Sequence, residues 1–209
     1  MRRFHSSVIM ILFGLMAAFT MMSTAHAVPV LIIDSNGQLL GADDVDVDGS
    51  LFDVRFVDGT CVDLFGGCNE NSDFDFPIAA SATLAAQALL DQVFLDIVQG
   101  SFDSDPSLTH GCESIDSCLV VIPTGDGGVS QTDTATALND DLEVGDIVFF
   151  PSLGVNNDLT AFDTAVFASF TPSVSSQSVP EPATLILFAL GLTGLVATSR
   201  WEYLNVQKG

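Results

Sequence analysis

The chain has 209 residues, of which 27 are acidic and 5 are basic, and its formal net charge at pH 7 is −22. This acidity excludes nucleic acid as a partner, because nucleic-acid binding requires a basic surface. The 16 phenylalanines and a hydrophobic share of 48% exclude a disordered chain, because disorder requires low hydrophobicity.

Residues 1–27 have the three parts of a secretory signal peptide. Two arginines precede the apolar run Val8–Met22, and Ala25 and Ala27 match the small-residue rule for cleavage. We therefore expect export through the Sec machinery and a mature chain that begins at Val28. An uncleaved membrane anchor is the alternative, but the run is shorter than the ~20 apolar residues that span a bilayer.

The mature region is far more acidic than the whole chain. Between Val28 and Ser178 it contains 25 acidic residues, one Arg and no Lys, which gives a net charge of −24. About 150 residues suffice for one domain with its own core, which we place at residues 28–171. Cations, basic polymers and polyvalent metals are the partners that this charge favours, and solubility outside the cell is the alternative explanation.

Residues 29–59 predict a small antiparallel meander. Asn-Gly at 36–37 and Asp-Gly at 48–49 are signals for tight hairpin turns. The segments 45–47 and 51–57 alternate apolar with charged side chains, which is the period of a half-buried strand. We expect one apolar face against the core and one acidic face in water.

Asp44, Asp46, Asp48 and Gly49 match the first half of an EF-hand calcium loop. The twelfth position of such a loop requires a bidentate Glu, and Arg55 stands there instead. An acidic hairpin is therefore the favoured interpretation. A Ca²⁺ site on the three aspartates, within a calcium-stabilised adhesion module, is the alternative, and we predict no other cofactor.

Four cysteines fall into two local pairs, Cys61 with Cys68 and Cys112 with Cys118. Because an exported chain meets an oxidising compartment, disulfides are expected, and the spacing favours these local loops among the three pairings. A four-thiolate zinc site is the alternative, although the usual C-x2-C spacing is absent.

The segment Ile78–Val98 predicts one long helix, because it is Ala-rich and contains no Gly or Pro. The stripe formed by Leu89, Val93 and Ile97 should face the sheet. With the meander before it and strands after it, the helix defines an α+β fold, in which it packs on one face of a small antiparallel or mixed sheet.

After the helix, three further strands are predicted. They are Leu119–Ile122, Val144–Phe150 and Ala161–Phe170. Residues 123–143 between the first two are expected to be mostly loop, with a short helix over Thr134–Leu138.

No catalytic motif stands out in the mature region. His110 is its single His, so a Ser-His-Asp or Cys-His arrangement would have to use it, and the nearby Cys112 is expected to be oxidised. The carboxylates are so many that the pair of a polysaccharide-acting hydrolase cannot be singled out. We therefore expect a non-enzymatic protein, with the secreted hydrolase as the alternative.

The C-terminal part begins with a small, polar segment over residues 172–178, which predicts a flexible linker. Residues 179–209 follow, and their apolar run Ala183–Ala197 predicts a helix in lipid. The residues that mark this segment are Val179, Pro180, Glu181 and Pro182 before the run and Arg200 after it.

The box, the apolar run and the basic residue together resemble the PEP-CTERM sorting signal of Gram-negative bacteria. The resemblance implies a transient anchor in the inner membrane, a cut near Glu181 by an exosortase, and delivery to the cell surface or the extracellular matrix. It also implies a role beside extracellular polysaccharide or in a biofilm. A plain C-terminal membrane anchor is the alternative.

Overall fold

The computed structural model describes residues 28–128, 130–142 and 145–173. The described residues belong to one compact unit that ends at Ser173. Ala25 and Ala27 of the predicted cleavage site and the whole sorting segment lie outside the described residues.

The centre of the described domain is an eight-stranded mixed sheet. In chain order its strands are β1 (Val30–Ile33), β2 (Leu39–Val47), β3 (Ser50–Val57), β6 (Ser117–Gly128), β7 (Gln131–Asp140), β8 (Ile147–Phe149), β9 (Ser152–Gly154) and β10 (Ala165–Pro172). Their order in space is β1-β2-β3-β10-β6-β7-β8, and β9 pairs with β7. The last strand, β10, lies between β3 and β6, antiparallel to β3 and parallel to β6. The predicted α+β class is confirmed, with more strands than expected.

The predicted meander forms, and its turn and bulge explain the register in which β2 pairs with β3. Asp48 and Gly49 have φ of 51° and 84°, so they make a tight turn between β2 and β3 in which both residues are left-handed. Asp44 has a φ of 60° at a register shift between Ala42 and Val45, which marks a bulge in β2. Beyond the bulge the alternation resumes, and the two valines of this segment are buried while the aspartates remain accessible.

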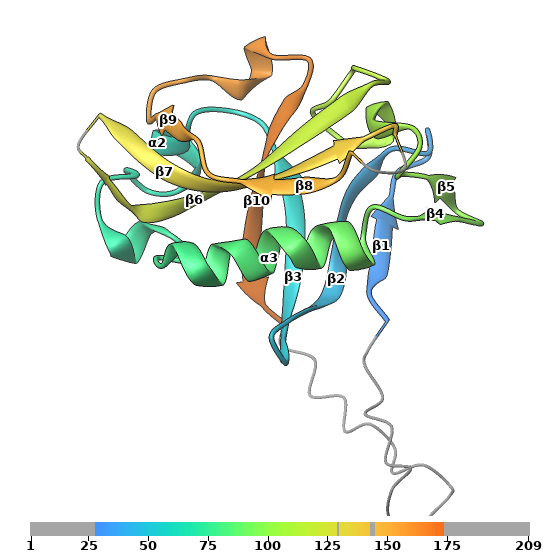
Figure 1. Cartoon of the computed structure of the whole chain (residues 1–209), viewed down its shortest axis with the longest axis horizontal. Helices are drawn as coiled ribbons and strands as arrows, with labels where there is room; N and C mark the ends of the chain where they lie inside the picture. The colour runs from blue at the N-terminus through green and yellow to red at the C-terminus, as the bar shows by residue number, and fades with distance from the viewer. Residues whose placement is uncertain (1–27, 129, 143–144, 174–209) are drawn as a thin grey trace, which may run out of the picture. The chain divides into compact units, whose positions relative to one another are not determined.

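The main helix, α3 (Ala79–Gln92), is shorter than the predicted Ile78–Val98. It crosses one face of the sheet, and it contacts β2, β6, β7 and β8 (Figure 1). Leu89 and Val93 are buried as expected. The chain leaves the helix because Phe94 also enters the core, where its ring stacks on Phe56 with centroids 5.6 Å apart.

The residues after α3 form a short hairpin, β4 (Asp96–Ile97) with β5 (Gly100–Ser101). Ile97, predicted to face the sheet from the helix, is therefore exposed. The described residues also form three short 3-10 helices, namely η2 (Asn71–Asp73), η3 (Pro106–Leu108) and η4 (Leu159–Ala161).

A second, smaller core lies apart from the one beneath α3. The short helix α2 (Cys61–Leu64) and the residues that follow it pack here, with Phe65 edge-on to Phe167 of β10 at 5.5 Å between centroids. Alternate residues of β10 serve the two cores: Phe167 belongs to this cluster, while Val166 and Phe170 belong to the larger one. The central strand is thus covered on both faces.

The prediction for residues 123–143 is wrong, because this segment forms the end of β6 and all of β7. Thr132, Thr134 and Thr136 alternate with Ala135 and Ala137, and all five side chains are buried. The threonine hydroxyls are satisfied within the sheet, for example between Thr134 and Thr136 at 3.1 Å. Small residues on both faces of a strand differ little in hydrophobicity, which explains why the sequence pattern predicts a loop here. The other two predicted strands also differ from their expected bounds. Strand β8 is shorter than the predicted Val144–Phe150, and β10 begins and ends later than the predicted Ala161–Phe170.

Candidate functional site

A hollow of about 600 Å³ opens where the β2–β3 turn, the end of α3 and the start of the described chain meet. Three of its lining residues are carboxylates, Asp46, Asp48 and Asp91. The others are Val28, Pro29, Gly49, Gln92 and Leu95. The hollow is therefore lined by both carboxylates and apolar side chains.

Hydrogen bonds fix the walls of this hollow. The Gln92 side chain donates to the carbonyl of Asp46 at 2.8 Å and accepts from its backbone N–H at 3.0 Å. The Asp46 carboxylate accepts from the Gly49 N–H at 2.7 Å, and the Asp91 carboxylate accepts from Gln87 at 3.0 Å. The two bonds between Gln92 and Asp46 join α3 to the β2–β3 hairpin, whereas the other two lie within the hairpin and within the helix.

The electrostatics of the hollow favour a positive group. The unpaired carbonyls at the C-terminal end of a helix carry partial negative charge, and α3 ends at Gln92 beside Asp91. The aspartates of the β2–β3 turn add to this field. A primary ammonium with an aliphatic neighbour suits such an acidic, partly apolar surface.

The three aspartates of the predicted calcium site are divided between two places. Asp46 and Asp48 line the hollow, whereas the Asp44 carboxylate accepts a short hydrogen bond from the Ser173 hydroxyl. Among residues 28–173, gaps aside, no group of three or more His, Cys, Asp or Glu side chains is placed to hold a metal ion. Calcium binding stays a prediction.

The single His of the predicted mature region, His110, lies near the Asp58 carboxylate. Burial raises the pKa of Asp58, which follows β3; the charge of His110 opposes this shift and the Asp158 carboxylate adds to it. One carboxylate oxygen of Asp58 is buried without a hydrogen-bond partner. The His110 ring nitrogen Nδ1 lies 3.4 Å from the Gln38 side-chain oxygen. A carboxyl group with a raised pKa suits a general acid, but these residues do not line the hollow.

A further carboxylate with a raised pKa lies elsewhere. Burial raises the pKa of Asp146, its hydrogen bond from the Asp140 N–H opposes the shift, and the nearby Asp103 and Asp140 carboxylates add to it. Perturbed carboxylates are thus spread over separate elements. The hydrolase alternative stays a prediction.

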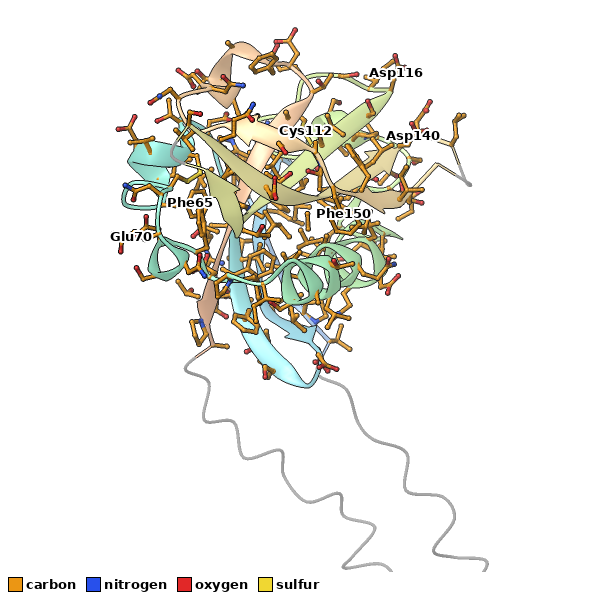
Figure 2. All side chains as sticks on the ribbon, turned by 60° about the vertical axis from the view of Figure 1, so that its left-hand side comes forward. Phe65, Glu70, Cys112, Asp116, Asp140 and Phe150 are labelled. Carbon is orange, nitrogen blue, oxygen red and sulfur yellow. A yellow bond between two sulfur atoms is a disulfide. The ribbon has the colours of Figure 1, made fainter. Side chains whose placement is uncertain are left out.

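The structure forms the two local disulfides, Cys61–Cys68 and Cys112–Cys118, with Cα atoms 5.8 Å and 5.7 Å apart. Each lies in a different core cluster, the first beside α2 and the second in the larger core (Figure 2 labels Cys112). All four sulfurs are used, so the alternative of a four-thiolate zinc site does not hold.

No helix within the described ranges is long and apolar enough to cross a membrane. The predicted anchor, from Ala183 to Ala197, lies beyond Ser173 and outside those ranges. For this part of the chain the comparison with protein families is decisive. The PEP-CTERM protein-sorting motif matches residues 178–200, from the residue before Val179 to Arg200.

The chain carries a PEP-CTERM sorting motif. It is therefore an exported protein, targeted to an exosortase and processed at the membrane. The motif covers only the C-terminal signal and gives no information on the acidic domain. No curated protein and no solved structure matches the chain.

Sequence reasoning found the sorting residues but missed most of the hollow. In the sequence, Asp91 shares a stripe of the predicted helix with Leu84, Ala88 and Leu95. An Asp at an otherwise apolar position was the available signal that this stripe borders a polar site. Nothing local marked Gln92, because its partner Asp46 lies 46 residues earlier.

Proposed function

We propose that the exported domain is a non-enzymatic acidic module of the extracellular polymer layer, at the cell surface or in a biofilm matrix. It acts by binding cations and polymers through many carboxylates. The observation that carries this proposal is the charge of the mature region, with 25 acidic residues against one Arg.

The placement of the charges supports the proposal. In the described part of the domain, no Asp or Glu is among the buried residues. Glu70 and Asp116 lie at the outer edge on opposite sides of the domain (Figure 2). Arg55 pairs with Asp43 at 2.8 Å, with side chains that are 46% and 40% exposed, so this partly exposed ion pair neutralises little of the negative charge.

Distributed carboxylates favour weak, multivalent binding. Extracellular calcium modules bind with dissociation constants of about 10⁻⁴ to 10⁻³ M, and a surface without a closed ligand cage should be no tighter. Exposed charges are screened beyond about 8 Å at physiological ionic strength, so binding should weaken as monovalent salt rises. A divalent cation can also bridge the domain to an anionic polysaccharide.

The test uses the mature chain from Val28 to Ser178, which contains both cores and both disulfides. Calcium binding is measured by equilibrium dialysis at moderate NaCl, and polymer binding on alginate and chitosan beads. Two matched variants each remove two charges: Asp48→Asn with Asp91→Asn in the hollow, and Asp116→Asn with Asp163→Asn, which do not line it. We expect weak binding of several ions per chain and a similar, small loss in both variants.

Two outcomes would overturn this proposal. If the mature chain binds neither calcium nor either polymer at moderate salt, the proposed role is wrong. Complete loss of calcium binding when Asp44, Asp46 and Asp48 are changed to Asn shows a single specific site, and supports the calcium-stabilised adhesion module instead.

A further inference from the structure

We propose that the α-ammonium group created by signal cleavage at Val28 binds in the acidic hollow at the end of α3. Export would then complete the folded domain, because the processing step places a positive group beside the carboxylates of the hollow. This inference depends on export and on cleavage after Ala27, and it is independent of any calcium or polymer binding.

The strand register brings the start of the mature chain to the hollow. Val30 of β1 pairs with Asp43 of β2 in antiparallel register. Continuing this register past β1 sets Val28 beside the part of β2 that follows the bulge. Pro29 has no backbone N–H to donate to a ladder, which is consistent with β1 beginning after it. Val28 and Pro29 accordingly line the same hollow as Asp46.

Cleavage changes the charge at this point. Water adds across the Ala27–Val28 peptide bond, so the new carboxylate leaves with the signal peptide and the new ammonium stays on Val28. Before cleavage the same nitrogen is part of a neutral amide. Arg55 is the single Arg or Lys between Val28 and Ser178, and its side chain is already paired with Asp43.

The titratable groups around the hollow come from two elements. Asp46 and Asp48 belong to the end of β2 and its turn, and Asp91 belongs to α3. The Asp46 carboxylate already accepts the Gly49 N–H, so Asp48 and Asp91 are the better positions to test. Asn preserves size at both, and it tolerates the left-handed φ of 51° at residue 48.

The sequence allows a clean chemical test. No Lys occurs between Val28 and Ser178, so an amine-acetylating reagent modifies this chain at the Val28 nitrogen alone. The thermal melting of free and acetylated chains is compared from pH 6 to pH 10 at low salt. An exposed ion pair predicts that the free chain melts about 1 to 4 °C higher near pH 6.

The pH dependence has a definite sign. Nearby carboxylates favour the charged amine, so its pKa in the folded chain should lie above the unfolded value of about 7.7 to 8.0. The stabilisation is then fully present below the unfolded pKa, and it is lost as the pH rises through the folded pKa. The two melting curves should coincide at pH 10.

The charge variants decide whether the hollow is responsible. Asp48→Asn with Asp91→Asn should abolish the difference between free and acetylated chains, whereas Asp116→Asn with Asp163→Asn should preserve it. Equal melting of the free and acetylated parent chains at every pH would overturn the inference. So would a difference that survives in the hollow variant, or a mature chain whose mass shows that it begins elsewhere than Val28.

Discussion

At the scale of single residues, Gly41 is the position where the backbone of the sheet leaves least room. It lies in β2 opposite Arg55, with a φ of 152°. A Cβ atom built on it would lie 2.1 Å from the carbonyl oxygen of Val54, and backbone cannot yield as a flexible side chain does. The close pairing of β2 with β3, which fixes one wall of the hollow, therefore requires glycine here.

Replacing this glycine should destabilise the domain strongly. Gly41→Ala is expected to lower the free energy of unfolding by about 2 to 4 kcal/mol, because β2 and β3 must move apart. Gly37→Ala is the matched control, since Gly37 also has a positive φ of 87° but nothing lies within 4 Å of its Cβ position. Its cost should be about 1 kcal/mol. Urea unfolding of both variants measures the difference, and equal losses would contradict the crowding at Gly41.

At the scale of elements, short sequence patterns predict only those elements whose contacts are between residues close together in the sequence. The turn at Asp48-Gly49 and the alternation around it specify the β2–β3 hairpin from the sequence alone. The end of α3 was misplaced because it depends on contacts distant in sequence, between Gln92 and Asp46 and between Phe94 and Phe56. The hollow could not be predicted for the same reason, since three separate segments build it.

The sorting signal and the disulfides, in contrast to the hollow, could be predicted because they depend on residues close together in the sequence. A sorting motif acts as a linear segment, so its residues were identified without any knowledge of the fold. Cysteines six and seven residues apart can close only small loops, and spacing alone favoured the pairs that form. By contrast, β7 was missed because its alternating Thr and Ala differ too little in hydrophobicity to indicate which side is buried.

Each disulfide should contribute a similar amount to stability. Closing loops of this length restricts the unfolded chain by about 2 kcal/mol. We therefore expect Cys112→Ala with Cys118→Ala, and separately Cys61→Ala with Cys68→Ala, to lower the melting temperature by roughly 5 °C each. Melting with and without a reductant provides the control. The reductant should lower the melting temperature of each variant by less than that of the parent chain, because one disulfide is already absent. Unchanged melting in both variants would contradict a stabilising role.

At the scale of the whole molecule, both ends of the domain lie at the β2–β3 turn. Val28 lines the hollow beside this turn, and the Ser173 N–H donates to the Leu51 carbonyl at 2.9 Å. Figure 1 shows β1 beginning and β10 ending at the same end of the domain. The predicted signal peptide would precede Val28 and the sorting segment follows Ser173, so both join the described domain at the same end, and cutting either need not open the folded domain.

This arrangement predicts that sorting and folding can be separated. Replacing Pro180, Glu181 and Pro182 together with Ala should block processing, so that the larger part of the protein stays in the membrane fraction at the mass of the uncut chain. Ser175→Ala with Ser176→Ala is the matched control in the preceding linker, and it should be processed normally. Because the box lies beyond Ser173, the last described residue, whose N–H donates to the sheet, both proteins should form the two disulfides and melt alike. Normal processing of the box variant would show that the exosortase reads other residues of the segment, and a lower melting temperature would show that the domain extends past Ser173.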